Sequence, residues 1–213
     1  NLPALHAQEL TTVVPYLTLG ETMGKLYYQM NKEAVNKVEI IYQGPVADME
    51  TSLITRSVLK GVFDPVLKER INVVNAELAA AAQGVDVVES KLTGEGKDNR
   101  ITVNIHDGKE TFTVEGTVLA GIGHITGING YNFDLVPAKN MIIVKNEDTP
   151  GVIGQIGTIL GAAHVNIATM QVSLSDKDAK AMMYLTVDSE VSKDTIKLIG
   201  GINGMTNAYF VKL

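Results

Sequence analysis

The chain has 213 residues, of which 45% are hydrophobic and 20% charged, a composition typical of a globular protein with one large or two small domains. It contains no cysteine, which excludes disulfides, thiolate catalysis and cysteine-bound metal, and no apolar run near the roughly 18 residues of a membrane helix. The net charge of −6, with lysine and arginine scattered, argues against nucleic-acid binding. We therefore expect a cytoplasmic protein without nucleic-acid or membrane partners.

The first segment predicts a connector followed by a long helix. Residues 1–5 are typical of the middle of a connecting segment, so we expect a piece of a longer protein. Apolar residues then recur at intervals of three and four over residues 8–31, and the regular helix should begin near Pro15. Gly20 and Gly24 lie on one face of this helix, where they would let another backbone approach closely; a core helix is the simpler interpretation.

The middle of the chain predicts a mixture of strands and helices. We expect, in order, a strand at 38–42, a break at Gly44-Pro45, a helix at 50–63 interrupted at Pro65, a helix at 72–83 ended by Gly84, a strand at 85–90, a flexible turn at 93–98, and strands at 100–106 and 110–119. Asp107-Gly108 is a strong hairpin signal between the last two strands. Glycines then punctuate residues 121–130, and residues 131–135 alternate like a strand.

The last third predicts a second small domain after a boundary at residues 137–140. We expect a strand at 141–144, a helix at 150–163, strands at 165–174 and 181–187 around a turn at 175–178, a helix at 193–199 and a strand at 205–212. This βαββαβ order is the ferredoxin-like plan. The residues predicted to face inward from the first helix are Ile153, Ile156, Ile159, Leu160 and Ala163. The predicted organisation is therefore a connector and long helix over 1–34, an α+β domain over 35–138 and a βαββαβ domain over 139–213.

The loop before the helix at 150–163 is a candidate binding site. Thr149 is a good N-cap and Pro150 suits the first helical position, and a helix N-terminus favours negative charge. The carboxylate of a free amino acid would take the first backbone amides, and its ammonium would take Asp148 or Asn146. A structural alternative is that Asp148 and Thr149 only cap the helix. The candidate residues of this loop are Asn146, Asp148, Thr149, Gly151 and Val152.

No catalytic or metal-binding pattern accompanies this loop. The four histidines are dispersed and lack metal-ligand spacing, and no serine nucleophile elbow or paired-carboxylate signal is present. No Gly-x-Gly-x-x-Gly follows a strand; Gly154, Gly157 and Gly161 lie along a helix and suit close packing instead. We therefore expect no catalytic residue, no metal and no cofactor in this chain.

Two sets of motifs resemble a known family. The sequence of residues 146–151, the amphipathic helix after it and Val165-Asn166-Ile167 resemble the ACT domain, a regulatory module of amino-acid metabolism. Residues 73–76, 115–118 and 128–131 resemble the intervening domain of long-form D-3-phosphoglycerate dehydrogenases. The resemblance covers nearly the whole chain. It implies an α+β fold, in which an intervening α+β domain precedes a ferredoxin-like βαββαβ ACT domain.

The resemblance also implies a regulatory function. In this family L-serine is held between two chains, which by position implies Asn146 and Asp148 from one chain and Asn166 from the other. It implies feedback inhibition by serine and a homo-oligomer built through ACT pairing, at least a dimer here and a tetramer in the parent enzyme. The parent would oxidise 3-phosphoglycerate in serine biosynthesis, with NAD in a catalytic part that this sequence lacks.

Some members of the family that this chain resembles hold an anion in the intervening domain through basic residues at the subunit interface. Here His124, Val136 and Thr186 occupy those positions, and neutral side chains do not replace several cations around a phosphate. We therefore expect no strong anion site of that type. The alternatives to the dehydrogenase are the regulatory portion of an iron–sulfur L-serine dehydratase, a stand-alone amino-acid-binding ACT protein, and a dimerisation module that binds no amino acid.

Overall fold

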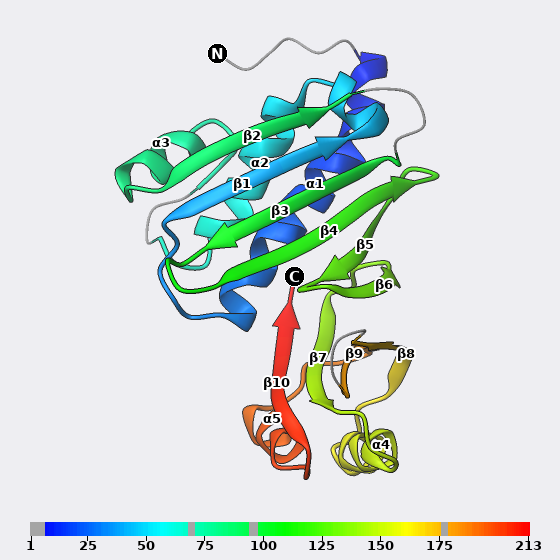
Figure 1. The fold of residues 1–213 in the computed structure, drawn as a ribbon. Coiled ribbons are helices and arrows are strands. Elements are labelled where there is room, and N and C mark those ends of the chain that lie inside the picture. Colours follow the sequence, from blue (N-terminus) through cyan, green and yellow to red (C-terminus); the bar gives the residue numbers. More distant parts are fainter. Residues whose placement is uncertain (1–6, 68–70, 94–97, 176–178) are drawn as a thin grey trace. The chain divides into compact units, whose positions relative to one another are not determined.

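The computed structural model describes residues 7–67, 71–93, 98–175 and 179–213, and the side chains from residue 11 on. The expected connector at residues 1–5 and most of the expected turns at 93–98 and 175–178 lie outside these residues. The chain divides into two compact units (Figure 1). Unit 1 comprises Asn1–Asn129 and Asp134–Pro137, and unit 2 comprises Gly130–Phe133 and Ala138–Leu213.

Unit 1 contains β1 to β5 and the end of β6 from a six-stranded sheet of order β2-β1-β3-β4-β5-β6. The strands are β1 Lys37–Gln43, β2 Asp86–Leu92, β3 Arg100–His106, β4 Thr111–Leu119, β5 Ile122–Ile128 and β6 Tyr131–Leu135. β1 and β2 are parallel, whereas β1–β3, β3–β4 and β4–β5 are antiparallel. Burial alternates strictly along β1 and β3, as expected for strands with one face on a core. The strands predicted from the sequence are confirmed, but β5 was not predicted.

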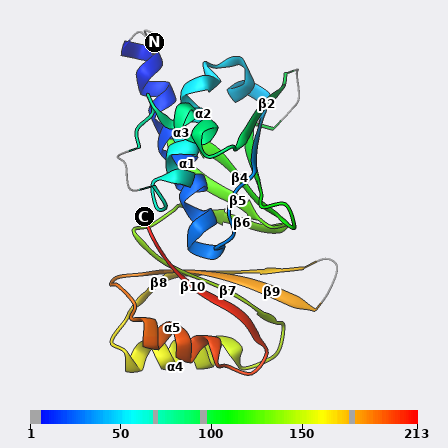
Figure 2. The same cartoon turned by 90° about the vertical axis from the view of Figure 1, so that its left-hand side faces the viewer.

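Helices cover one face of this sheet (Figure 2). They are α1 Ala7–Met30, the 3-10 turn η1 Gly44–Asp48, α2 Thr51–Phe63 and α3 Ala76–Ala82. The prediction of a helix beginning near Pro15 was wrong, because α1 starts eight residues earlier and runs through this proline. A proline inside a helix removes one backbone hydrogen bond. The burial of the apolar side chains that follow Pro15 along one face of α1 offsets that loss.

The predicted helix at 72–83 begins late, at Ala76. Asn72 explains the delay: its Oδ1 accepts from the backbone N–H groups of Val74 and Asn75, at 2.8 and 3.1 Å. This side chain offers the backbone an alternative to helical hydrogen bonds. The predicted stop at Gly84 is confirmed by its φ of +68°.

α1 and α2 cross through glycines. A Cβ on Gly24 would lie 2.2 Å from the Val58 carbonyl oxygen, and one on Gly61 would lie 2.1 Å from the Glu21 carbonyl oxygen. Both distances are far below van der Waals contact, so each helix approaches the other's backbone where a side chain is missing. The close approach predicted from Gly20 and Gly24 is therefore confirmed, and it brings the helices together over a common core.

Strand β5 escaped prediction because its sequence is rich in glycine. Gly123 of β5 and Gly116 of β4 lie under Leu19 of α1, since a Cβ on either would come within 3.2 Å of that leucine. Glycine weakens a strand locally, but here it makes room for a helix on the sheet. The need for that room comes from a residue about a hundred positions away, which no local pattern reveals.

The β4–β5 hairpin turns at Ala120-Gly121, with φ of 49° and 79°. Such positive φ values at both central residues suit Asn-Gly, the pair that forms the next turn at Asn129-Gly130 with φ of 49° and 82°. We expect Ala120→Asn to stabilise unit 1 by about 1 kcal/mol, because asparagine tolerates this backbone region better than alanine. Denaturant unfolding followed by circular dichroism measures the change. Ala120→Val should destabilise instead, and equal stabilities of the two variants would contradict the turn geometry.

Unit 2 has the predicted βαββαβ order. Its elements are β7 Asn140–Glu147, α4 Val152–Ala162, β8 Ile167–Leu174, β9 Lys180–Val187, α5 Lys193–Gly200 and β10 Met205–Lys212. The four strands form an antiparallel sheet of order β10-β7-β9-β8, and both helices lie on one face (Figure 2). The ferredoxin-like fold predicted from the order of elements is confirmed.

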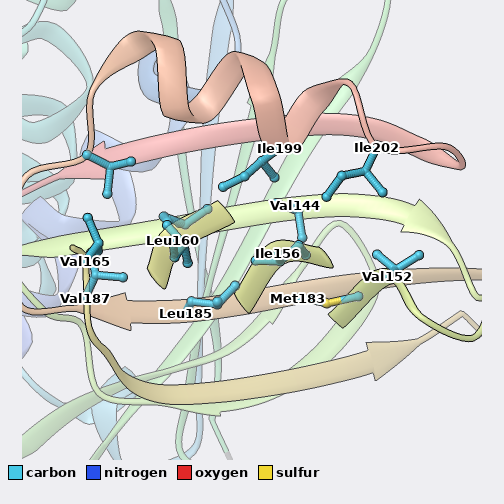
Figure 3. Packing of buried hydrophobic residues seen from close by; sticks show 12 residues of the cluster. Val144, Val152, Ile156, Leu160, Val165, Met183, Leu185, Val187, Ile199 and Ile202 are labelled. Carbon is cyan, nitrogen blue, oxygen red and sulfur yellow. The ribbon is translucent and has the colours of Figure 1, made fainter. Parts of the chain in front are cut away.

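The core of unit 2 lies between that sheet face and the two helices (Figure 3). α4 contributes Val152, Ile156 and Leu160, which are at most 2% exposed. The predicted inward positions of Ile153 and Ala163 were wrong, because both are exposed. α4 begins two residues later than predicted, so Val152 takes the first core position and Ile153 turns outward. No helix among the described residues is long and apolar enough to span a membrane.

Candidate functional site

The loop between β7 and α4 is fixed by backbone hydrogen bonds to two distant segments. The Glu147 N–H donates to the Gly204 carbonyl at 2.8 Å, and the Asp148 N–H donates to the Ala179 carbonyl at 2.9 Å. Sequence reasoning missed both partners; the only local signal was the glycine at 204, whose φ is +83°. The side chains of Asp148 and Thr149 are exposed on this fixed backbone. The carboxylate is therefore presented to solvent at a defined place.

The start of α4 differs from the prediction. The N-cap is Gly151, with φ of 94°, and no side chain caps the helix. The predicted capping by Thr149 and placement of Pro150 at the first helical position were therefore wrong, because the chain turns through the left-handed glycine first. The first helical hydrogen bond runs from Gln155 N–H to the Gly151 carbonyl at 3.1 Å. The amides of the first turn, including Val152, remain available to an anion.

Asn146 is the most buried polar residue at this end of the sheet, at 1% exposure. It follows Ile142 and Val144 at intervals of two along β7, so its side chain lies on the face that α4 covers. Its Nδ2 donates to the Glu147 carbonyl at 2.7 Å, but its Oδ1 is buried without a hydrogen-bond partner among the described residues. An unsatisfied buried acceptor destabilises a fold by about 1–3 kcal/mol. An N–H or O–H donor that reached the Asn146 Oδ1 would therefore stabilise the fold.

Asn166 lies at the opposite end of α4. The helix ends before His164, whose φ is 55°, and Asn166 follows in an exposed turn. Its backbone is fixed by Asp188, whose Oδ1 accepts the Asn166 N–H at 3.1 Å and whose N–H donates to the Asn166 carbonyl at 3.2 Å. The 11 residues of α4 separate the two ends by about 16 Å. One chain thus places Asn146 near the end of β7 and the other four candidate residues at the start of α4 and in the loop before it, whereas Asn166 lies at the far end of α4.

The flank of α4 above β8 is open. A Cβ added to Gly154, Gly157 or Gly161 would have no atom of the described residues within 4 Å, and Ile153 beside them is 47% exposed. The close packing predicted for these glycines is therefore absent within the described chain. β8 below is an edge strand with Val172 and Leu174 exposed at 42% and 57%. The flank of α4 and the edge of β8 together form an exposed apolar surface on unit 2.

His124, Val136 and Thr186, which stand where the anion-binding proteins carry basic residues, have the following surroundings. His124 contacts the Asp134 carboxylate at 2.7 Å, Val136 is half-exposed, and the Thr186 hydroxyl is bonded to Thr169 at 2.7 Å. Two cations of α2 are paired, Arg56 with Glu77 at 3.3 Å and Lys60 with Glu21 at 2.6 Å. No group of three potential metal ligands is found in the described part of the chain.

Comparisons with known proteins match both units. The D-3-phosphoglycerate dehydrogenase intervening domain matches residues 12–128, and the ACT domain matches residues 140–202. D-3-phosphoglycerate dehydrogenase of Bacillus subtilis is 35% identical over the whole chain and 41% of its own length. The protein of that name from Methanocaldococcus jannaschii is 32% identical with the same coverage. D-3-phosphoglycerate dehydrogenase 2, chloroplastic, of Arabidopsis thaliana is 28% identical over the whole chain and 37% of its length. The chain thus spans about two fifths of the length of these relatives.

Proposed function

The chain belongs to the D-3-phosphoglycerate dehydrogenase family, as its intervening domain followed by its ACT domain, and from this premise we propose that it senses L-serine for such an enzyme. The observation that carries the proposal is the buried Oδ1 of Asn146, which lacks a donor among the described residues and belongs to the strand whose end leads to the N-terminus of α4. A zwitterionic amino acid presents both an anion and a donor. The loop offers a complementary group for each.

The ligand is proposed to bind with its carboxylate at the first turn of α4. The amides of Gly151 and Val152 and the positive end of the helix dipole attract a carboxylate there. The ammonium lies near the exposed carboxylate of Asp148, and the Asn146 Oδ1 takes a donor from the ammonium or the serine hydroxyl. Thr149 lines the mouth of the site. A charge-assisted hydrogen bond of this kind contributes about 1.5–3 kcal/mol.

Asn166 joins the site from a second copy. β8 runs in the same direction as β7, because both are antiparallel to β9, so β8 ends beside the N-terminus of α4. If two β8 edges pair antiparallel around a two-fold axis, the start of each strand lies at the end of the other. Asn166 immediately precedes β8 and would therefore reach the β7–α4 loop of the second copy.

The same pairing accounts for the open flank of α4. Gly157 and Gly161 would let the two α4 helices approach closely, and the exposed Val172 and Leu174 would be covered along the strands. We therefore propose a homodimer through the ACT domain as the minimal unit, within a tetramer of the parent enzyme. Serine then acts by population shift: it favours the arrangement in which both chains contact it, with a coupling of about 1–3 kcal/mol.

Oxidation of 3-phosphoglycerate, and the NAD it requires, are proposed for the portion of the relatives outside the matched region. The glycines of α4 do not form a dinucleotide-binding turn, because they lie along the helix beside open space and not in the turn between a strand and a helix. The relatives are named dehydrogenases, which favours this parent over an L-serine dehydratase. The cytoplasmic location stays a prediction.

Isothermal titration calorimetry with L-serine tests the site. We expect saturable binding to the full chain that D-serine does not reproduce, and we expect Asp148→Ala to weaken it tenfold to a hundredfold, which corresponds to about 1.4–2.8 kcal/mol. Asp194→Ala, which removes an equally exposed carboxylate on α5, is the matched control and should bind like the wild type. Unchanged binding in Asp148→Ala, or no binding at millimolar serine, would refute the proposed site.

A further inference from the structure

The strand β2 forms an open edge of the sheet in unit 1. It pairs with β1 in parallel from Asp86 to Leu92 without a register shift, and no other described strand lies beside it. Six of its seven residues are exposed, and Ser90 is the exception. Proteins usually protect such an edge with a proline, a bulge or several lysines. β2 has neither proline nor bulge and has a single lysine, Lys91.

β2 is nevertheless held rigidly in place. The carboxylate of Glu89 accepts hydrogen bonds from the hydroxyls of Thr51 and Thr55 on α2, the second at 2.6 Å. The Thr55 hydroxyl also bonds the buried Tyr42 hydroxyl of β1 at 2.8 Å. This network ties the edge strand to a helix and to its neighbouring strand. The outward backbone groups of β2 are therefore preorganised for pairing with another strand.

We propose that β2 pairs antiparallel with the β2 of a second copy of this chain, centred on Ser90. A two-fold axis perpendicular to a sheet must place one residue opposite itself, because paired residues share a face. Centring on Ser90 places Glu89 opposite Lys91 twice, and Val88 opposite Leu92 twice. The first pairs carry opposite charges, and the second cover two apolar side chains that are 37% and 41% exposed.

The neighbouring registers are less favourable. Centring on Glu89 or on Lys91 places two like charges directly opposite one another, which is destabilising. Centring on Val88 places Glu89 opposite Val87 and leaves Lys91 without a carboxylate across the strand. The charges of β2 therefore select the Ser90 register. This register also puts the two α3 helices, each of which precedes its β2, at opposite ends of the paired strands.

The contact is an association surface separate from the ACT pairing and does not depend on serine binding. It involves only a few residue pairs, so it is weak between free chains. Once two chains are joined elsewhere, the effective concentration of the second contact is high. Together the two self-complementary edges would assemble dimers into a larger oligomer.

Cysteine cross-linking tests both the contact and its register, because the chain has no cysteine of its own. In the proposed register the two Ser90 Cα atoms lie about 4.5–5.5 Å apart, within the range of a disulfide. The Val87 residues of the two copies are six positions out of register, or about 20 Å apart. Under mild oxidation the Ser90→Cys full chain should therefore become a disulfide-linked dimer, whereas the more exposed Val87→Cys should stay largely monomeric on non-reducing gels. Equal cross-linking of both variants, or preferential linking of Val87→Cys, would overturn the proposal, as would the absence of any link in Ser90→Cys.

A second measurement uses charge. Sedimentation velocity of the full chain without cross-links should show that Lys91→Glu weakens association beyond the dimer at least tenfold, since it places glutamates opposite one another. Lys193→Glu, which reverses an exposed charge on α5, should leave association unchanged. Identical sedimentation of Lys91→Glu and the wild type would contradict the pairing.

Discussion

Replacing Gly24 with alanine is expected to destabilise unit 1 by about 3 kcal/mol. The new Cβ would lie 2.2 Å from the Val58 carbonyl oxygen and 2.7 Å from the Val62 backbone nitrogen. These are backbone atoms of α2, so no side-chain rotation relieves the overlap. The two helices must separate, and the core between them and the sheet then loses its close packing.

Gly200→Ala is the matched control, because it makes the same substitution inside a helix, α5, where the atom nearest to the new Cβ, the Cβ of Ala208, lies 4.0 Å away. It should stabilise unit 2 by up to about 1 kcal/mol through helix propensity. Scanning calorimetry and denaturant titration of both variants beside the wild type measure the two changes. Stabilisation by Gly24→Ala of the same size as by Gly200→Ala would mean that α1 and α2 do not approach one another at this glycine.

The second large effect is expected from mixing two variants that are each defective in serine binding. Asp148→Ala and Asn166→Ala should each weaken serine binding at least tenfold at every site, because each proposed site takes Asp148 from one chain and Asn166 from the other. After the two variants are unfolded together and refolded, mixed dimers contain one site with both native residues. About a quarter of all sites should then bind L-serine again, as expected for random pairing about a two-fold axis. Calorimetry of the mixture measures the number of sites.

The controls separate this result from misfolding. Each variant refolded alone should retain the far-ultraviolet circular dichroism of the wild type and show no binding sites of wild-type affinity for serine. A mixture that binds nothing, although both variants are folded, would show that the two residues do not share a site across chains. Restored binding without refolding would instead indicate rapid subunit exchange, which is a measure of how tightly the ACT domains pair.

The sequence by itself determined the type and order of most elements. Apolar spacing identified α2 and α5, alternation identified β1 and β3, and Gly84 marked the end of α3. These signals are local, because burying one face of a helix or strand requires a fixed period in the sequence. The βαββαβ order then sufficed for the fold of unit 2, since few topologies accommodate it.

Only the tertiary structure decided where α4 begins and what the glycines do. The carbonyls of Ala179 and Gly204 fix the β7–α4 loop, so the helix starts after Gly151 rather than at Thr149. Gly24 meets a backbone at 2.2 Å, whereas Gly154 meets open space, although both lie inside helices. A glycine permits close approach, but its partner comes from a distant segment. The candidate site depends on the same non-local contacts, which bury Asn146 at one end of α4 and leave Asn166 at the other.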